Sequence, residues 1–358
     1  MKKKRLSMNN IVEDNGKMYF LAFTSNSIYE MNKDMSACRV IKRIIDNSRG
    51  VQRGELPQHE GIYIYKNKIV ILPDTIKRIL VYDMNVDKIR YIEYPDSDYI
   101  YTPFFGGIIH NHYLYILPCT HNKVFKLDLE CEHLYEINLG DVEINKVLNI
   151  CAWGAVAFHD NKVVFTSMEG KKIFLLRLDS DSIEDVTPDG FHDDLAGVVC
   201  LDNRYWVFPK KCDRIIVLNN NFEVIYERYI DIDNYLCGDW SFFKLQVIDS
   251  YIYMLPRRAN TFIRYSVEQD KFEAINISNI SIKKNRLDKF MPISNVWKNN
   301  GDTYFAHSSS GKIFKIISGG IEECIIKVDT DYKISYVSMM VYENDEFDGL
   351  SDFLDSFC

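Results

Sequence analysis

The feature that most constrains the fold is a short phrase that recurs along the chain. It consists of a polar turn, a run of alternating apolar and aromatic residues, and a final proline or small polar residue. The clearest copies span residues 67–73, 111–118, 203–209 and 250–256, and looser copies span 15–23, 161–167 and 301–307. The last residues of successive copies are separated by 50, 45, 49, 42, 47 and 51 positions. A period in the forties that contains several strand-like runs is typical of a β-propeller.

Each copy has the same neighbours, which together predict a four-stranded blade. A run that begins with small residues precedes the phrase, as in 61–65, 106–109, 154–158 and 196–200, and a third run and a more polar fourth run follow it. We assign the first run to the innermost strand, where glycine avoids collisions with neighbouring blades. The fourth run is the outer edge, where Lys, Arg and Glu oppose edge-to-edge pairing. Turns such as Asn15-Gly16 and Asp202-Asn203 favour the positive φ angles of tight hairpins.

We therefore predict an all-β protein, a β-propeller with seven four-stranded blades, with six blades as the alternative. Residues 1–345 form a single propeller domain, and residues 346–358 form an acidic C-terminal tail or a short helix. The segment 334–342 looks like one more first strand. It either closes the ring by pairing with the first blade or packs as an extra strand.

Composition argues against several classes of protein. The formal net charge of −8 is unlike that of a general nucleic-acid binder, which usually has a basic excess. No apolar run approaches the length of a transmembrane helix, and residues 6–10 are too polar for a signal peptide. The nine cysteines are scattered and include no Cys-x-x-Cys pair, so we expect reduced thiols. We expect a cytoplasmic monomer with no cofactor and neither a membrane nor a nucleic-acid partner.

The repeat resembles that of kelch-type and related β-propellers over most of the chain. A kelch repeat carries a glycine pair at the end of its second strand, whereas Gly106-Gly107 opens a first strand here. The Gly-His and Trp-Asp pairs of the WD type are not found. The resemblance thus implies the propeller superfamily without a named family, and it assigns no functional residue.

Function in a propeller normally collects where the second strand connects to the third and where one blade connects to the next. We call this the long-loop face, because connections such as 46–60, 140–153 and 277–294 are long and irregular. Residues that precede a first strand, near the mouth of the central channel, include His59, Tyr101, Trp153, His192 and Trp240. Two interpretations are open: these side chains stack on a sugar, a base or a peptide side chain, or they plug the channel.

The same face gathers positive charge. Six-residue windows that begin at the last residue of each phrase hold eleven Lys or Arg residues and three Asp or Glu residues, although the whole chain is negative. Lys210, Arg257 and Arg258 follow prolines that fix where they point. The windows predict a basic ring that binds an anionic partner, with lysines that only aid solubility as the alternative.

No chemical motif accompanies the repeat. His110 and His112 flank a turn residue, and His121 and His133 fall at opposite ends of a predicted third strand, so a zinc site is not expected. The leading hypothesis is a non-enzymatic propeller that binds a protein, peptide or glycan. The alternative is a hydrolase or lyase at the channel mouth, with His59, His192 or His307 as the acid or base.

Overall fold

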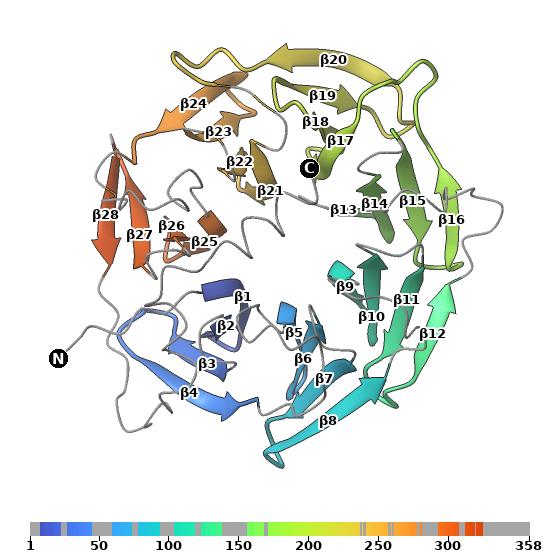
Figure 1. The fold of residues 1–358 in the computed structure, drawn as a ribbon, viewed down its shortest axis with the longest axis vertical. Helices are drawn as coiled ribbons and strands as arrows, with labels where there is room; N and C mark the ends of the chain where they lie inside the picture. Colours follow the sequence, from blue (N-terminus) through green and yellow to red (C-terminus); the bar gives the residue numbers. More distant parts are fainter. Residues whose placement is uncertain are drawn as a thin grey trace, which may run out of the picture.

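The computed structural model describes residues 8–22, 27–44, 59–73, 78–93, 104–118, 123–137, 156–167, 171–236, 238, 241–256, 259, 261–277, 280, 293–307, 312–318 and 320–324. Their strands form seven sheets, each made of four antiparallel strands that are consecutive in sequence. Figure 1 shows these sheets as blades around a common centre. The prediction of an all-β propeller with seven blades is therefore confirmed. No helix in the described ranges has the length and apolar character needed to cross a membrane.

The strands of blades 1 to 4 have the following bounds: β1 (Met8–Asp14), β2 (Lys17–Ala22), β3 (Ser27–Asn32), β4 (Cys38–Arg43); β5 (His59–Tyr65), β6 (Lys68–Pro73), β7 (Arg78–Asp83), β8 (Lys88–Glu93); β9 (Phe104–His110), β10 (Tyr113–Pro118), β11 (Val124–Asp128), β12 (Leu134–Ile137); β13 (Ala157–His159), β14 (Lys162–Thr166), β15 (Ile173–Arg177), β16 (Ser182–Asp185). Those of blades 5 to 7 are β17 (Leu195–Leu201), β18 (Arg204–Pro209), β19 (Arg214–Leu218), β20 (Val224–Tyr229); β21 (Phe242–Ile248), β22 (Tyr251–Pro256), β23 (Phe262–Ser266), β24 (Lys271–Ile275); β25 (Ile293–Asn299), β26 (Asp302–His307), β27 (Lys312–Ile317), β28 (Gly320–Cys324).

The repeated phrase is the second strand of each blade. β6, β10, β18, β22 and β26 end at the last residue of a phrase, and β14 and β2 end one residue earlier. The hairpins between first and second strands have the expected geometry. Asn15 and Gly16 have φ angles of 48° and 73°, and Asp202 and Asn203 have φ angles of 54° and 56°. Such pairs of positive φ angles match the twist of the strands that they connect.

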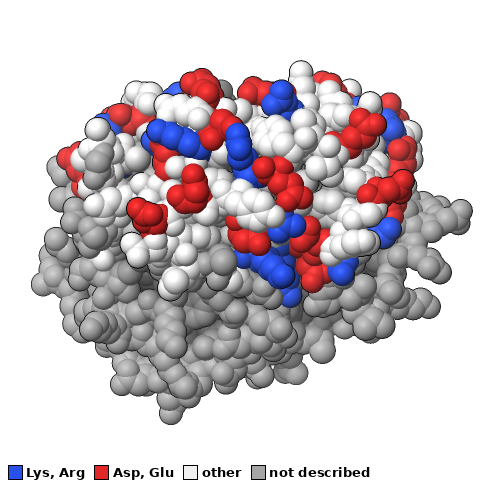
Figure 2. All heavy atoms as spheres, turned by 90° about the horizontal axis from the view of Figure 1, so that it is seen from above, with Lys and Arg blue, Asp and Glu red and all other residues white. Residues whose placement is uncertain are grey.

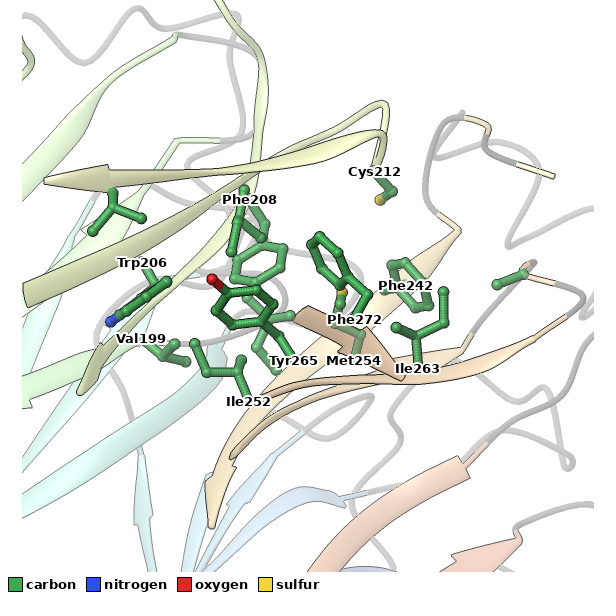
Figure 3. Close-up of a cluster of buried hydrophobic side chains, with 14 residues drawn as sticks. Val199, Trp206, Phe208, Cys212, Phe242, Ile252, Met254, Ile263, Tyr265 and Phe272 are labelled. Carbon is green, nitrogen blue, oxygen red and sulfur yellow. The ribbon is translucent and has the colours of Figure 1, made fainter. Parts of the chain in front are cut away.

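The second strands read as continuous apolar runs because both of their faces are buried between blades. In β6, Val70 and Leu72 pack against blade 3, while Ile69 and Ile71 pack against blade 1. Buried clusters fill every seam of the ring in this way. Figure 3 shows the seam between blades 5 and 6, where Trp206 lies beside Tyr265 with ring centroids 5.4 Å apart. Burial on both sides of every blade supplies the main stabilisation of the ring.

Glycine is required in one innermost strand, but for a different reason than the sequence suggested. A Cβ at Gly107 would lie 2.5 Å from the backbone oxygen of Tyr115, in the adjacent strand of the same blade. A Cβ at Gly61 would meet the ring of Tyr63, in its own strand, at 2.9 Å. At these two positions the crowding therefore arises within the blade rather than from a neighbouring blade. Gly154, which we expected beside the channel, lies outside the described residues.

Ion pairs connect several blades on the side opposite the long-loop face. Acidic residues in turns between third and fourth strands have positive φ angles and accept from a cation of the preceding blade. The pairs are Lys42 with Asp87 (2.7 Å), Lys68 with Glu132 (2.9 Å), Lys126 with Asp181 (2.6 Å) and Arg228 with Asp270. Figure 2, which views the ring from its edge, shows Lys and Arg side chains interspersed with Asp and Glu side chains over the described part of the surface.

Blade 7 is held by side-chain amides on both sides. Gln246 of blade 6 bonds both the backbone N–H and the backbone C=O of Val296 at 2.8 Å. Asn299 donates to the backbone oxygen of Lys33 in blade 1. Blades 7 and 1 are each complete, so the ring closes in the described residues by packing of two whole blades. The segments 334–342 and 346–358, which we considered as a closing strand and a tail, lie outside the described residues.

Candidate functional site

The long-loop face receives the ends of second strands and the starts of first and third strands. The backbone of His59 opens β5 and pairs with Pro73, and His307 ends β26. Lys210 follows the end of β18, and His192 lies in the connection that leads into β17. The structure thus places these four predicted residues on one face. Outside the described residues lie Tyr101, Trp153, Trp240, Arg257 and Arg258.

The three histidines of the enzymatic hypothesis belong to different parts of the ring. His59 opens blade 2, His192 lies between blades 4 and 5, and His307 belongs to blade 7. His307 also lies on a second strand, one strand further from the centre than the backbone of His59. The backbone positions therefore separate these histidines rather than assemble them into one catalytic group.

His307 is buried and uncharged at neutral pH. Its side chain is 4% exposed, and it is opposite Lys312 in the sheet register. Burial lowers the pKa of its imidazole to about 4, and the charge of Lys312 contributes to the same shift. A base with a pKa so far below 7 is a weak proton acceptor at neutral pH.

The sequence His192-Asp193-Asp194 does not form an acid–base group of its own. The Asp193 carboxylate accepts from the Arg214 guanidinium at 2.7 Å, and His192 is exposed. Asp194 contributes its backbone oxygen, which accepts from the amide of Lys210 at 2.7 Å. This segment is therefore anchored to blade 5 by Arg214 and by the backbone of Lys210.

Arg214 is surrounded by three carboxylates. Besides Asp193, its guanidinium contacts Asp213 at 3.0 Å and lies 3.0 Å from Glu227, the latter as an ion pair without hydrogen-bond geometry. Burial acts to lower the pKa of this guanidinium, but the three carboxylates raise it overall. Arg214 is thus already paired with three neighbouring acids and is not available to an anionic ligand.

The same arrangement recurs around the ring. In several blades a cation at or next to the start of the third strand pairs with an acid of the fourth strand. The pairs are Arg78 with Glu93 (3.7 Å), Lys123 with Glu136 (3.2 Å), Lys172 with Asp185 (2.6 Å), Arg214 with Glu227 (3.0 Å) and Lys312 with Glu323 (2.6 Å). In the Lys172 pair, burial acts to raise the pKa of Asp185, but hydrogen bonds from Lys172 and Thr187 lower it overall. These pairs neutralise much of the basic ring.

Sequence reasoning missed these acids because it counted charge only in windows at the start of the third strand. The partners lie about ten to twenty residues further on, in the fourth strand. An antiparallel register between the third and fourth strands would have indicated the pairs, since the start of one strand faces the end of the next.

Among the described cations of the ring, Lys171, Lys210 and Lys211 remain outside this pairing, but Lys210 makes another interaction. Lys171 and Lys211 lie in the connections between second and third strands of blades 4 and 5. Both are exposed, and neither makes an ion pair with any other described residue. They are the described positions at which the long-loop face offers an unneutralised positive charge.

A metal site has no support among the residues that the structure describes, where no three His, Cys, Asp or Glu side chains lie close enough to share an ion. His110 and His112 lie on the opposite face, on either side of the turn at Asn111. The Nε2 atom of His112 lies 3.8 Å from the Asp128 carboxylate.

Comparisons with known proteins agree on the fold. No protein-family model and no curated protein sequence matches the chain. A structure of streptogramin B lyase superposes with a TM-score of 0.64 and 13% identity, over 90% of this chain and 96% of that one. A catalytically inactive virginiamycin B lyase from Staphylococcus aureus, solved with quinupristin, gives 0.65 and 15% over 88% and 96%. YCF48 bound to a D1 peptide gives 0.59 and 9% over 88% and 94%.

Identities this low show a shared fold and nothing about activity. The neighbours include lyases and a propeller that binds a peptide, so fold similarity leaves both hypotheses open. The resemblance to kelch-type repeats stays a prediction. The chain thus has the fold of a β-propeller with seven four-stranded blades.

Proposed function

We propose that this protein is a non-enzymatic binding propeller that holds a protein, peptide or glycan with anionic groups on its long-loop face. The observation that carries the proposal is the state of Lys171 and Lys211. They are exposed and make no ion pair with any other described residue, on two adjacent blades, while other cations of the face are neutralised by fourth-strand acids. An unneutralised ammonium group on a rigid scaffold is a suitable contact for a carboxylate or phosphate.

Lys210, Arg257 and Arg258 extend the same surface in this proposal. Lys210 belongs to the same connection as Lys211, and the two arginines follow Pro256 at the corresponding place in blade 6. His59, Tyr101, Trp153, His192 and Trp240 complete the proposed ligand-binding face, and His307, which is buried, would contribute only where binding exposes it. The aromatic residues among them would stack against the partner.

The test uses a fluorescein-labelled decapeptide of glutamate as an anionic probe, measured by fluorescence anisotropy. We expect binding that weakens as salt rises, because the contacts are exposed charges. Changing Lys171 and Lys211 together to glutamate should weaken binding of the probe. Adding the changes of Lys210, Arg257 and Arg258 to glutamate in the same protein should weaken binding further. Affinity purification from the source cell, followed by mass spectrometry, would then identify the natural partner.

A matched control carries the same change of charge on the other face. Lys88 and Arg204 are exposed, make no ion pair with another described residue, and lie at tight turns. Their joint change to glutamate should leave binding of the probe unaltered. Equal losses in the two charge-reversed pairs would show a general charge effect and contradict a site on the long-loop face.

A lyase is the second candidate, because the lyase neighbours align over nearly their whole length. In this chain His307 would be the acid or base, and its burial would have to be relieved when substrate binds. Incubation with quinupristin, followed by liquid chromatography, tests this. Turnover that disappears in His307→Ala would favour the lyase, and no turnover by the folded wild-type protein would count against this substrate.

A further inference from the structure

The outer edge of blade 5 differs from the other outer edges of the propeller. Five of the six residues of β20 are exposed, whereas β8, β24 and β28 keep most of their residues at least half-buried. Val224 is 47% exposed, Ile225 is 46% exposed and Tyr229 is 64% exposed. Figure 1 shows β20 along the outer rim of the ring. Exposed apolar side chains on a free edge are what most sheets avoid, because such an edge can pair with another strand.

The neighbouring blade explains this exposure. Glu227 is opposite Ile216, which packs into the seam with blade 4, and Tyr229 is opposite Arg214 on the same side. Arg228 points the other way and pairs with Asp270 of blade 6. The outer strand of blade 4, β16, has only four residues against six in β20. A short β16 therefore leaves the blade-4 side of β20 uncovered.

Unpaired backbone groups accompany these side chains. The amide of Ile230 donates to the backbone oxygen of Asp213 at 2.9 Å. The backbone N–H and C=O groups of residue 230 therefore point towards β19. Successive residues of a strand direct their backbone groups to opposite edges. The N–H and C=O groups of Tyr229 and Glu227 therefore point outward, where no described strand pairs with them.

The charge along this edge selects the partner. Glu223, Glu227, Asp231 and Asp233 follow one another along the exposed rim, and Arg228 is the one cation among residues 223–233. Glu227 and Arg228 are already paired within the protein. Asp231 and Asp233 are exposed and make no ion pair with any described residue. These two carboxylates complement lysine or arginine side chains.

We propose that β20 and residues 230–233 form a docking edge for an extended basic segment of a partner protein, which adds to the sheet as a fifth strand of blade 5. Backbone bonds to Glu227 and Tyr229 would align the segment. Basic side chains on one face of the segment would meet Asp231 and Asp233, and their methylene stems would lie over Ile225 and Tyr229. This site is separate from the long-loop face and has the opposite charge preference.

The experiment compares two end-capped fluorescent octapeptides, one of alternating valine and lysine and one of alternating valine and glutamate. Fluorescence anisotropy with the full chain should show binding of the lysine peptide only. Asp231→Asn with Asp233→Asn should weaken it about threefold to tenfold, the range for two exposed charge pairs. As a matched control, Glu268→Gln with Glu322→Gln neutralises two exposed acids elsewhere and should leave binding unchanged.

A second pair of variants separates the backbone from the side chain. Tyr229→Ala removes the aromatic ring and keeps the backbone N–H that points outward. Tyr229→Pro removes the ring and this N–H, and it leaves the hydrogen bonds to β19 intact because the N–H of residue 229 does not bond to β19. The proline variant should bind the lysine peptide about threefold to tenfold more weakly than the alanine variant, which corresponds to one backbone hydrogen bond. Circular dichroism checks that both variants are folded.

Four results would overturn the proposal, three of them from the binding measurements. The three binding results are equal binding of the two peptides to the wild type, equal affinity of the proline and alanine variants for the lysine peptide, and absence of binding of the lysine peptide to the folded wild type. A dimer in sedimentation velocity that Tyr229→Pro abolishes would also overturn it, because the edge would then pair with a second copy of the chain.

Discussion

Gly107 shows at the scale of one residue how closely the strands of a blade approach each other. An added methyl group there would meet a backbone oxygen that belongs to the β-ladder and has no room to move. The methyl group at Gly61 would meet the far end of a tyrosine side chain, which can rotate away. Two glycines in equivalent innermost strands therefore differ in how strictly they are required.

We expect Gly107→Ala to lower the free energy of unfolding by more than about 1 kcal/mol, the usual scale of overpacking. Gly61→Ala should cost clearly less. Urea denaturation of the two variants beside the wild type measures both values. An alanine variant at 107 that is as stable as the one at 61 would show that β10 yields more easily than the structure implies.

The burial of His307 makes the stability of the protein depend on pH. Its pKa is about 4 in the folded protein, against an ordinary value of 6.5. Below pH 6.5 the unfolded chain takes up a proton that the folded protein does not, so this contribution to stability is complete above pH 6.5 and is lost as pH falls towards 4. Between pH 7 and pH 5 the free energy of unfolding should fall by about 2 kcal/mol for this reason.

Replacing His307 by glutamine should remove this part of the pH dependence. The difference in unfolding free energy between pH 7 and pH 5 should shrink by about 2 kcal/mol relative to wild type. Urea denaturation at the two pH values gives the comparison directly. The same pH dependence in both proteins would mean that His307 becomes protonated without unfolding.

At the scale of elements, the turns between third and fourth strands connect one blade to the next. Glu132, at a φ angle of 61°, accepts from Lys68 and from Arg90, both in blade 2. Burial acts to raise the pKa of Glu132, but these two cations lower it overall. Removing the charge would leave two cations without their partner at a half-buried position.

Glu132→Gln is therefore expected to lower the unfolding free energy by about 1–3 kcal/mol, the range for a hydrogen-bonded charge removed from partial burial. Glu184 provides the control, because its pair with Arg177 lies within one blade and is exposed. Glu184→Gln should cost less than about 1 kcal/mol. Thermal or urea unfolding of both variants tests whether contacts between blades matter more than contacts within them.

At the scale of the whole molecule, burial between blades holds the described residues together, and no disulfide joins the cysteines among them. The described cysteines 38, 131, 200, 212 and 324 are all free thiols. Burial raises the pKa of the Cys38 thiol to about 12, whereas Cys131 is exposed. The cytoplasm, a reducing compartment, stays a prediction that rests on the spacing of the nine cysteines in the sequence.

Titration with Ellman's reagent should find nearly all nine thiols in the denatured, unreduced protein. In the native protein Cys131 should react early and Cys38 late, because a buried thiol is rarely ionised. Mass spectrometry of the labelled peptides distinguishes the two sites. Missing pairs of thiols after denaturation would point to disulfides and to an oxidising compartment.

The amino-acid sequence by itself determined most strands and hairpins, and it favoured seven blades over six. These features depend on neighbours in sequence: alternation sets the strands, Asn, Asp and Gly allow the turns, and a proline or small polar residue marks the end of five of the seven second strands. The bounds of β6, β10, β18 and β22 could therefore be predicted to the residue at their C-terminal ends.

Tertiary structure decided which charges are available and which surfaces are covered. The neutralisation of Lys172 and Lys312 depends on the register between third and fourth strands, and the environment of Glu132 depends on the neighbouring blade. The exposure of β20 depends on the length of β16, which lies in another repeat. Charge pairing and burial are properties of groups brought together by ring closure, so a count of residues along the chain cannot contain them.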